Sequence, residues 1–107
     1  MTTLIDPGIA KLQAQAGEAA RLLAMIGNEK RLLILCRLAG GETPVGELAE
    51  VTGLSQSALS QHLARLREDG LAAPRKDGLR VYYRLTDPRA AKLLETLKDI
   101  FCPEDRG

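Results

Sequence analysis

Apolar residues recur at intervals of three and four along most of the chain, which is the spacing of one face of an α-helix. This pattern predicts a first helix over about residues 8–26 and a second over roughly 29–39. Gly40-Gly41 follows the second stretch and is expected to stop it. The first third of the chain is therefore expected to be helical.

Two shorter helices are expected next, on either side of a tight turn. Thr43-Pro44 is expected to supply a capping residue and then a proline at the first position of a short third helix. Thr52-Gly53-Leu54 indicates the turn, and Ser55 is expected to cap a fourth helix that runs to about Asp69. Such a pair of helices is typical of a helix-turn-helix, here over about residues 45–69.

The spacing of apolar residues changes from helical to strand-like after the fourth helix. Residues 71–76 and 79–85 are predicted to be strands, with Asp77-Gly78 between them as a two-residue type I′ turn. Asp87 is then expected to cap a last helix over about 88–102. The chain is thus predicted to have five helices, with a hairpin between the fourth and the fifth.

This order of elements predicts a mainly α protein with a β-hairpin wing, namely a winged helix-turn-helix. We expect a single domain over residues 1–107 with the wing at about 71–85, because 107 residues of which 45% are apolar build one modest core. The chain has no run of 18 apolar residues, and its start lacks the basic and apolar regions of a signal peptide. A cytoplasmic location without a membrane partner is therefore expected.

Charge is unevenly distributed along the chain, although the formal net charge is only +1. Residues 54–85 carry six Lys and Arg against three Asp and Glu. Residues 1–53 and residues 86–107 each carry one more acidic than basic residue. The positive charge therefore coincides with the predicted helix-turn-helix and wing, which favours a nucleic-acid partner.

The predicted fourth helix has an apolar and a polar face. Leu59, Leu63 and Leu66 fall within about 60° on a helical wheel of roughly 100° per residue, so they are expected to face the core. Opposite them stand mostly short, uncharged side chains, whose hydrogen-bond donors and acceptors suit base edges in the major groove. The residues expected to contact bases or nearby phosphates are Gln56, Ser57, Ser60 and Gln61. His62 is expected to donate to a phosphate.

The predicted wing strengthens this interpretation. Arg75, Lys76 and Arg80 cluster around Asp77-Gly78, and a protruding basic loop suits contacts with phosphates across the adjacent minor groove. The polar face of the fourth helix alone would be equally typical of an ordinary surface helix. The basic hairpin that follows it favours DNA binding.

Three motifs follow one another at regular spacing in this half of the chain. They are the Ser57-x-x-Ser60-x-His62-Leu63 run, the Gly70-Leu71 junction and the Tyr82-Tyr83-x-Leu85 strand. With them, the chain resembles the ArsR (arsenic-repressor) family along essentially its whole length. The resemblance implies a homodimer through the first and last helices, about 8–26 and 88–102. It also implies a two-fold symmetric double-stranded DNA operator and repression that an inducer relieves.

Metal sensing, common in that family, does not suit these residues. Metal sensors of the family often use cysteines in the third helix, but residues 47–51 contain none. Others use Asp and His pairs on the last helix, whereas no histidine follows Asp87. Because borderline and soft metals need several Cys or His ligands, and this chain has two Cys and one His, no metal site and no cofactor is expected.

Two cysteines lie 66 positions apart, Cys36 expected on the inward face of the second helix and Cys102 at the C-terminal end of the last. This placement resembles the dithiol, persulfide-sensing branch of the family, which includes biofilm growth-associated and sulfide-responsive repressors. The resemblance implies that a persulfide or polysulfide inducer leads to a disulfide or polysulfide bridge within one subunit, and that the bridged form releases DNA. Arg37 and Lys98 are the candidate cations near the thiols.

Other interpretations remain open at this point. A cysteine among leucines, as Cys36 is, is often a small buried hydrophobe without reactivity. The signal of such a repressor can also be a metal, a general oxidant or haem, and a winged helix can serve as a protein-interaction module. An enzyme is not expected, because a single histidine on the DNA-reading helix and the lack of a phosphate-binding glycine motif leave no catalytic constellation.

Overall fold

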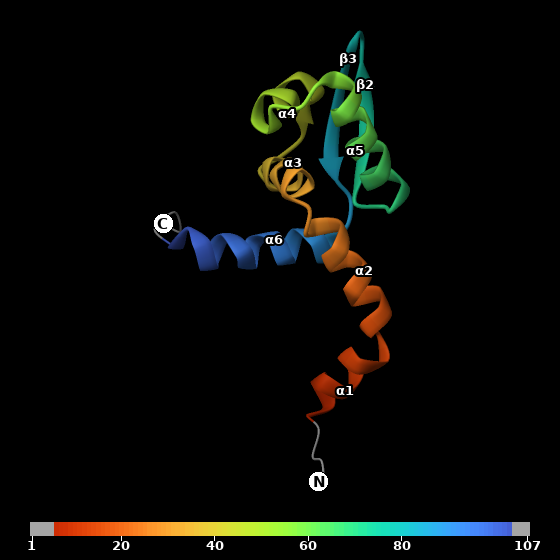
Figure 1. Ribbon diagram of the computed structural model, residues 1–107, viewed down its shortest axis with the longest axis vertical. Coiled ribbons are helices and arrows are strands. Elements are labelled where there is room, and N and C mark those ends of the chain that lie inside the picture. The colour runs from red at the N-terminus through yellow and green to blue at the C-terminus, as the bar shows by residue number, and fades with distance from the viewer. Residues whose placement is uncertain (1–5, 104–107) are drawn as a thin grey trace.

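The computed structural model describes residues 6–103, and Figure 1 shows their arrangement. The elements in chain order are α1 (Pro7–Ala14), α2 (Ala16–Ile26), α3 (Glu29–Ala39), β1 (Thr43–Pro44), α4 (Val45–Thr52), α5 (Gln56–Glu68), β2 (Ala72–Asp77), β3 (Arg80–Leu85) and α6 (Pro88–Phe101). The described part is mainly helical with a small antiparallel sheet, as predicted. The ends of the predicted domain 1–107, residues 1–5 and 104–107, lie outside the described residues.

The predicted first helix over about 8–26 is two helices, so the expectation of five helices is wrong for residues 6–103, which form six. The break falls at Gln15, whose backbone has left the helical region at φ −113° and ψ 20°. No residue of α1 is buried, so no packing holds α1 and α2 in one line. The local helix propensity then determines where the helix is interrupted. Gly17 in the first turn of α2 lowers this propensity next to the break.

Helix α3 has the bounds that its pattern predicted. Asn28 caps it, because its Oδ1 accepts hydrogen bonds from the backbone N–H groups of Lys30 at 3.0 Å and Arg31 at 3.1 Å. Ile34, Leu35 and Leu38 are buried. Since α3 packs against α2, α4, α5, α6 and β3, it is the central helix of the domain.

Thr43-Pro44 does not cap the next helix as predicted. The two residues form strand β1, in which Thr43 pairs with Tyr83 and Pro44 with Tyr82 of β3. The Thr43 hydroxyl donates instead to the carbonyl oxygen of Gly41 at 2.8 Å, and α4 begins without a side-chain cap. The pairing with β3 uses residues almost forty positions away, which no local pattern indicates.

The wing is the hairpin of β2 and β3, with a turn one residue later than predicted. Asp77 pairs with Arg80, so the two turn residues are Gly78 and Leu79 rather than Asp77-Gly78. Gly78 has φ +64°, and no described residue other than glycine has a positive φ. A glycine with positive φ at the first central position is a type II′ turn, whereas type I′ needs positive φ at both positions.

The core lies between α3, α5, α6 and the base of the wing. Leu59, Leu63 and Leu66 of α5 are all buried, which confirms the predicted inward face of that helix. The remaining large core side chains come from the neighbouring elements: Met25, Ile26, Ile34, Leu35, Leu38, Leu48, Leu71 and Leu94. This core holds α4, α5 and the wing as one body.

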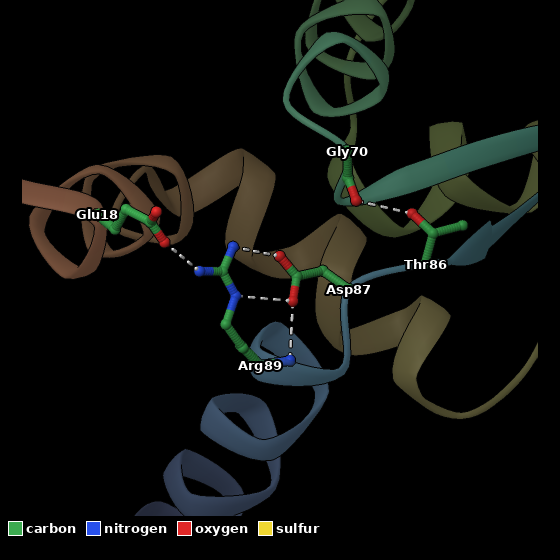
Figure 2. A network of polar contacts seen from close by, with 5 residues as sticks. All are labelled: Glu18, Gly70, Thr86, Asp87 and Arg89. Atoms are coloured by element: carbon green, nitrogen blue, oxygen red, sulfur yellow. Dashed lines mark hydrogen bonds and ion pairs between the residues drawn. The ribbon is translucent and has the colours of Figure 1, made fainter. Parts of the chain in front are cut away.

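A polar network joins α2 to the start of α6 (Figure 2). Asp87 caps α6 by accepting from the backbone N–H of Arg89 at 2.8 Å, as predicted for this residue. The Arg89 guanidinium contacts the Asp87 carboxylate at 2.9 Å and reaches Glu18 of α2 at 3.1 Å. Beside them the Thr86 hydroxyl donates to the Gly70 carbonyl at 2.8 Å. The contacts tie α6 both to α2 and to the end of α5.

Helices α1, α2 and α6 extend away from the body that carries the wing (Figure 1). The described residues measure 60 × 34 × 22 Å, an elongated shape for a chain of this length. Five large apolar side chains are exposed on these helices: Ile9, Leu12, Leu23, Ile100 and Phe101. Among the described residues no helix is long and apolar enough to cross a membrane.

Candidate functional site

The helix-turn-helix is set by contacts between the end of α4 and the start of α5. Gly53 ends α4 in the left-handed region at φ +70°, which a residue with a Cβ adopts only with strain. The Thr52 hydroxyl donates to the Leu48 carbonyl at 2.8 Å and accepts from the N–H of Leu54 at 3.3 Å. Ser55 caps α5 as predicted, its Oγ accepting from the N–H of Ala58 at 3.2 Å.

The polar side chains predicted to read bases share one face of α5. All four predicted base-reading residues, Gln56, Ser57, Ser60 and Gln61, are exposed. His62 differs from them because it is half-buried. The buried leucines on the opposite face fix the rotation of α5, so that the exposed face points out of the domain along its whole length.

A groove of about 1240 Å³ separates α4 and α5 from the wing. We call it the wing groove. It is lined on one side by Gln56, Ser60 and Arg67 of α5 and on the other by Leu79 and Arg80 of the wing. The predicted base-reading helix and the predicted phosphate-tracking hairpin therefore border one concave surface.

The three predicted wing cations are in different situations. Arg75 donates to both carboxylate oxygens of Glu42, at 2.8 Å from Nε and 2.7 Å from Nη2, and its guanidinium lies 5.0 Å from the centre of the Tyr82 ring. The hydrogen bond to Arg75 lowers the pKa of Glu42, and the same contact raises the pKa of Arg75. Arg80 donates weakly to the Tyr82 hydroxyl at 3.4 Å, and Lys76 is exposed.

Two side-chain contacts fasten α3 to α4. Near the start of α3, the Lys30 ammonium donates to the Thr52 carbonyl at 2.8 Å. Near its end, Arg37 forms an ion pair with Glu47, and its Nε donates to the Glu47 carboxylate at 2.6 Å. The central helix and the first helix of the helix-turn-helix are thus connected at both ends, so a displacement of α3 displaces α4 with it.

Cys36 is exposed on α3, so the expectation that it faces inward is wrong. The inward positions belong to Ile34, Leu35 and Leu38. Residues 32–36 of this helix are apolar without interruption, so the periodicity does not single out one face. The exposure of Cys36 also contradicts the burial that the alternative of an inert cysteine assumed. Cys102 caps the C-terminal end of α6 and is half-buried, and both thiols are free.

Both cysteines line one groove of about 1000 Å³ between α3 and α6, which we call the cysteine groove. Its apolar lining is formed by Leu32, Leu94, Leu97 and Phe101, and its charged residues are Lys92, Glu95 and Lys98. Burial raises the pKa of the Cys36 thiol, and the neighbouring Cys102 raises it further. The Cys36 thiol is therefore partly shielded by the groove even though the residue as a whole is exposed.

Of the two cations considered for the thiols, only Lys98 lines the cysteine groove, because Arg37 is paired with Glu47 on α4. The backbone N–H of Cys102 donates to the Lys98 carbonyl at 2.8 Å, which fixes the end of α6. Within residues 6–103, no three His, Cys, Asp or Glu side chains are grouped so as to hold a metal ion.

Several residues of the candidate site have no signal in the sequence pattern. Glu42 precedes Thr43 in a short loop, and its partner Arg75 is 33 positions away. Lys30 and Thr52 are joined over 22 positions. Leu79 counts as an ordinary strand residue in the alternation, although the structure places it at the wing tip. Only tertiary contacts identify their roles.

The geometry can be compared with known proteins. A family model described as "Bacterial regulatory protein, arsR family" matches residues 28–73. The HTH-type transcriptional regulator YgaV of Escherichia coli K12 is 47% identical over 96 residues, which cover 89% of this chain and 97% of that protein. The biofilm growth-associated repressor of Xylella fastidiosa Temecula1 is 39% identical over 95 residues, covering 89% and 83%.

Solved structures agree with these sequence matches. The transcriptional repressor BigR of Xylella fastidiosa superimposes with a TM-score of 0.82 at 40% identity, covering 87% of this chain and 95% of that one. Reduced HlyU of Vibrio cholerae, a protein named a transcriptional activator, superimposes with a TM-score of 0.80 at 43% identity. The match covers 86% of this chain and 97% of that one. The homodimeric winged helix-turn-helix DNA-binding domain of Mb0332 from Mycobacterium bovis superimposes with a TM-score of 0.68 at 32% identity. The match covers 94% of this chain and 89% of that one.

Proposed function

The chain belongs to the arsR family of bacterial regulatory proteins, and on that premise we propose that it is a homodimeric repressor that releases its operator when a persulfide or polysulfide modifies Cys36 and Cys102. Membership makes the chain a winged-helix, DNA-binding transcriptional regulator. The expectation that it is not an enzyme is confirmed by its relatives, which are transcriptional regulators. Its sensing chemistry is the part that we propose.

A homodimer is supported by the exposed apolar residues of α1, α2 and α6. Leu12 is 58% exposed, Leu23 is 56% exposed and Phe101 is 75% exposed in the single chain. Large apolar side chains grouped on extended helices are typical of a surface that a partner covers. The related Mb0332 domain is homodimeric, and a two-fold axis would present two copies of α5 to a two-fold symmetric operator.

DNA binding by this chain is proposed to use the exposed face of α5 and the wing. Gln56, Ser57, Ser60 and Gln61 would meet base edges or adjacent phosphates in the major groove. His62, Lys76 and Arg80 would meet phosphates. Arg75 would do so only after it leaves Glu42. The wing groove lies between these two sets of contacts, and its charged lining consists of Arg67 and Arg80 together with Glu47, Glu50 and Glu68.

The observation that carries the sensing proposal is that both cysteines line the same groove as free thiols. In a first step, one Cys thiolate attacks the terminal sulfur of a persulfide RSSH, the S–S bond breaks and RS⁻ leaves as a thiolate. In a second step, the other Cys thiolate attacks the protein-bound sulfur and HS⁻ leaves. The two cysteines are oxidised to a disulfide while the persulfide is reduced to a thiol and sulfide, so no further oxidant is required.

A polysulfide bridge, which contains additional sulfur atoms, forms by the same kind of exchange steps. A protein persulfide that takes up one more sulfur from a second RSSH again releases a thiolate, and closure by the other cysteine again releases HS⁻. Inserted sulfur atoms relax the limit of about 7 Å that a direct disulfide sets for the two Cα atoms. Because α3 is fastened to α4, joining α3 to the end of α6 would change the placement of the helix-turn-helix relative to the dimer helices.

The proposal is tested by the DNA affinity of the full chain with and without glutathione persulfide, measured for the wild type, Cys36→Ser and Cys102→Ser. The wild type should lose on the order of 30- to 150-fold in affinity, which corresponds to about 2–3 kcal/mol. Both variants should stay bound. Mass spectrometry should show a bridge between the Cys36 and Cys102 peptides.

The same assay separates the other signals. Wild-type protein that remains DNA-bound with unmodified thiols would refute persulfide sensing. Release by Zn²⁺ or As(III), by hydrogen peroxide or by haem alone would assign the metal, oxidant or haem alternative instead. Binding to an operator no tighter than to scrambled DNA would indicate a protein-interaction module.

A further inference from the structure

Exposed large apolar side chains of the described residues fall into two groups. Five lie on α1, α2 and α6, where a second subunit would cover them. The other two, Val51 and Leu79, both line the wing groove. Leu79 is the extreme case, because its exposure of 104% means that the rest of the protein covers none of it. A single exposed leucine is ordinary on a protein surface, so the position of Leu79 and its charged neighbours carry the argument rather than its exposure alone.

The backbone presents this leucine outward. Gly78 at φ +64° makes the tight turn that places Leu79 at the tip of the hairpin. The wing tip lies at the end of the molecule opposite α1, and α6 projects from the other end of the body (Figure 1). Leu79 is thus on the side of the predicted DNA contacts and away from the helices that a second subunit would cover.

The hairpin turn that carries Leu79 has a net positive charge. Lys76 and Arg80 are exposed on either side of the turn, against a single acidic residue, Asp77. Across the wing groove lie Gln56 and Ser60 of α5, and the acidic residues of the groove are Glu47 and Glu50 of α4 and Glu68 of α5. With α5 in the major groove, a hairpin tip on its flank reaches the neighbouring minor groove, whose walls are the apolar faces of the sugars.

We propose that Leu79 is a minor-groove contact that makes operator affinity depend on base pairs outside the segment read by α5. Its side chain has no hydrogen-bond donor or acceptor, so it packs against the sugars and the floor of the groove. Guanine places an N2 amino group on that floor, whereas A·T pairs leave it without one. Leu79 therefore favours A·T over G·C at the flanking positions. The inference rests on DNA binding through α5 and the wing.

The test uses duplexes selected from a random library by the full chain, with flanking pairs then set to A·T, G·C or inosine·C. Inosine lacks the N2 amino group but keeps the major-groove atoms of guanine. Wild-type protein should bind G·C flanks about tenfold more weakly than A·T flanks, and inosine·C should restore the affinity. Leu79→Ala should bind all three flanks alike and about tenfold more weakly than the wild type binds A·T.

Salt dependence separates this contact from the ionic ones. Leu79→Ala should leave the slope of log K against log salt unchanged, because no counterion is involved. The matched neighbour Arg80→Gln should reduce that slope by about 0.9 for each lost phosphate contact. Because Leu79 is fully exposed, its substitution should leave the circular dichroism spectrum and the dimer intact.

The outcomes distinguish the inference from the proposed interface. Flank preference that persists in Leu79→Ala, or that inosine does not abolish, would overturn the role of Leu79 while leaving DNA binding in place. Failure of the wild-type chain to select any duplex would refute the interface itself. A change of oligomeric state in Leu79→Ala would show that the leucine contacts another protein copy, which would also overturn the inference.

Discussion

Arg75 of the wing is held by Glu42, a residue of the loop between α3 and β1, through two hydrogen bonds of 2.7 and 2.8 Å. This bidentate pair ties the wing to the end of the central helix. Gly40, two residues before Glu42, lines the cysteine groove. The contact therefore connects the base of the proposed sensing site to a cation of the proposed DNA interface, and it competes with phosphate for that cation.

Glu42→Gln is expected to strengthen DNA binding. The substitution removes a negative charge beside the interface and frees the Arg75 guanidinium for a phosphate. The slope of log K against log salt should become steeper by about 0.9, as measured by fluorescence anisotropy on a non-specific duplex. Glu29→Gln, an exposed change at the start of α3, is the control and should leave the slope unaltered. An unchanged slope in Glu42→Gln would exclude Arg75 as a phosphate contact.

Asp87 is expected to make stability depend on pH in the acid range. The Arg89 side chain holds the pKa of this carboxyl below its usual value, which is about 3.9 in an unfolded chain. The stabilisation is therefore fully present above about pH 4 and is lost as the pH falls through the lower folded-state pKa. The free energy of unfolding of Asp87→Asn should be lower than that of the wild type at pH 7, and the two should converge as the pH falls through the lowered folded-state pKa.

Asp87→Ala removes the helix cap as well as the charge. It should destabilise the protein by about 0.5–2 kcal/mol, measured by urea unfolding at pH 7. The asparagine variant keeps a capping oxygen, so the difference between the two variants isolates the cap. Equal stability of all three proteins at pH 7 would contradict the importance of this network (Figure 2).

Leu66 and Leu23 are expected to differ sharply when each is shortened to alanine. Leu66 is fully buried against the core, so Leu66→Ala should lower the free energy of unfolding by about 2–5 kcal/mol. Leu23 is 56% exposed in the single chain, so Leu23→Ala should mainly weaken self-association in sedimentation equilibrium. If Leu23→Ala left self-association unchanged, the surface of α2 would not be the dimer contact.

Gln61 and Lys76 should separate base reading from phosphate binding. Gln61→Ala should reduce operator affinity by about 1–3 kcal/mol and leave affinity for scrambled DNA unaltered, as expected for a base contact. Lys76→Gln should weaken both complexes and lower the salt slope by about 0.9. Equal losses on both duplexes for Gln61→Ala would place that residue on the backbone instead.

Much of the fold was predictable because its signals are local. The bounds of α3, the cap of α5 by Ser55 and the cap of α6 by Asp87 depend on residues within one or two turns. The buried face of α5 follows from the spacing of three leucines. The exposed polar face of α5 follows from the same spacing, so the candidate base-reading residues are also found without coordinates.

Other features were mispredicted or missed because residues far apart decide them. Thr43-Pro44 suits a helix start locally, but pairing with β3 makes it a strand. Asp77-Gly78 suits a hairpin turn, but the register of β2 and β3 moves the turn to Gly78 and Leu79. The apolar stretch before Cys36 allows any face of α3 to point inward, and packing against the rest of the core turns the cysteine outward.

By itself, the order of residues determined most of the helical segments, the presence of the hairpin and the two faces of α5, because periodicity and capping act over a few residues. Through its motifs it also indicated the class of DNA-binding regulator. Tertiary structure alone decided that both cysteines share one groove, that Glu42 holds Arg75 and that Leu79 stands uncovered at the wing tip. Each of these features depends on whether segments distant along the chain are in contact, and only the packing of the whole domain determines that.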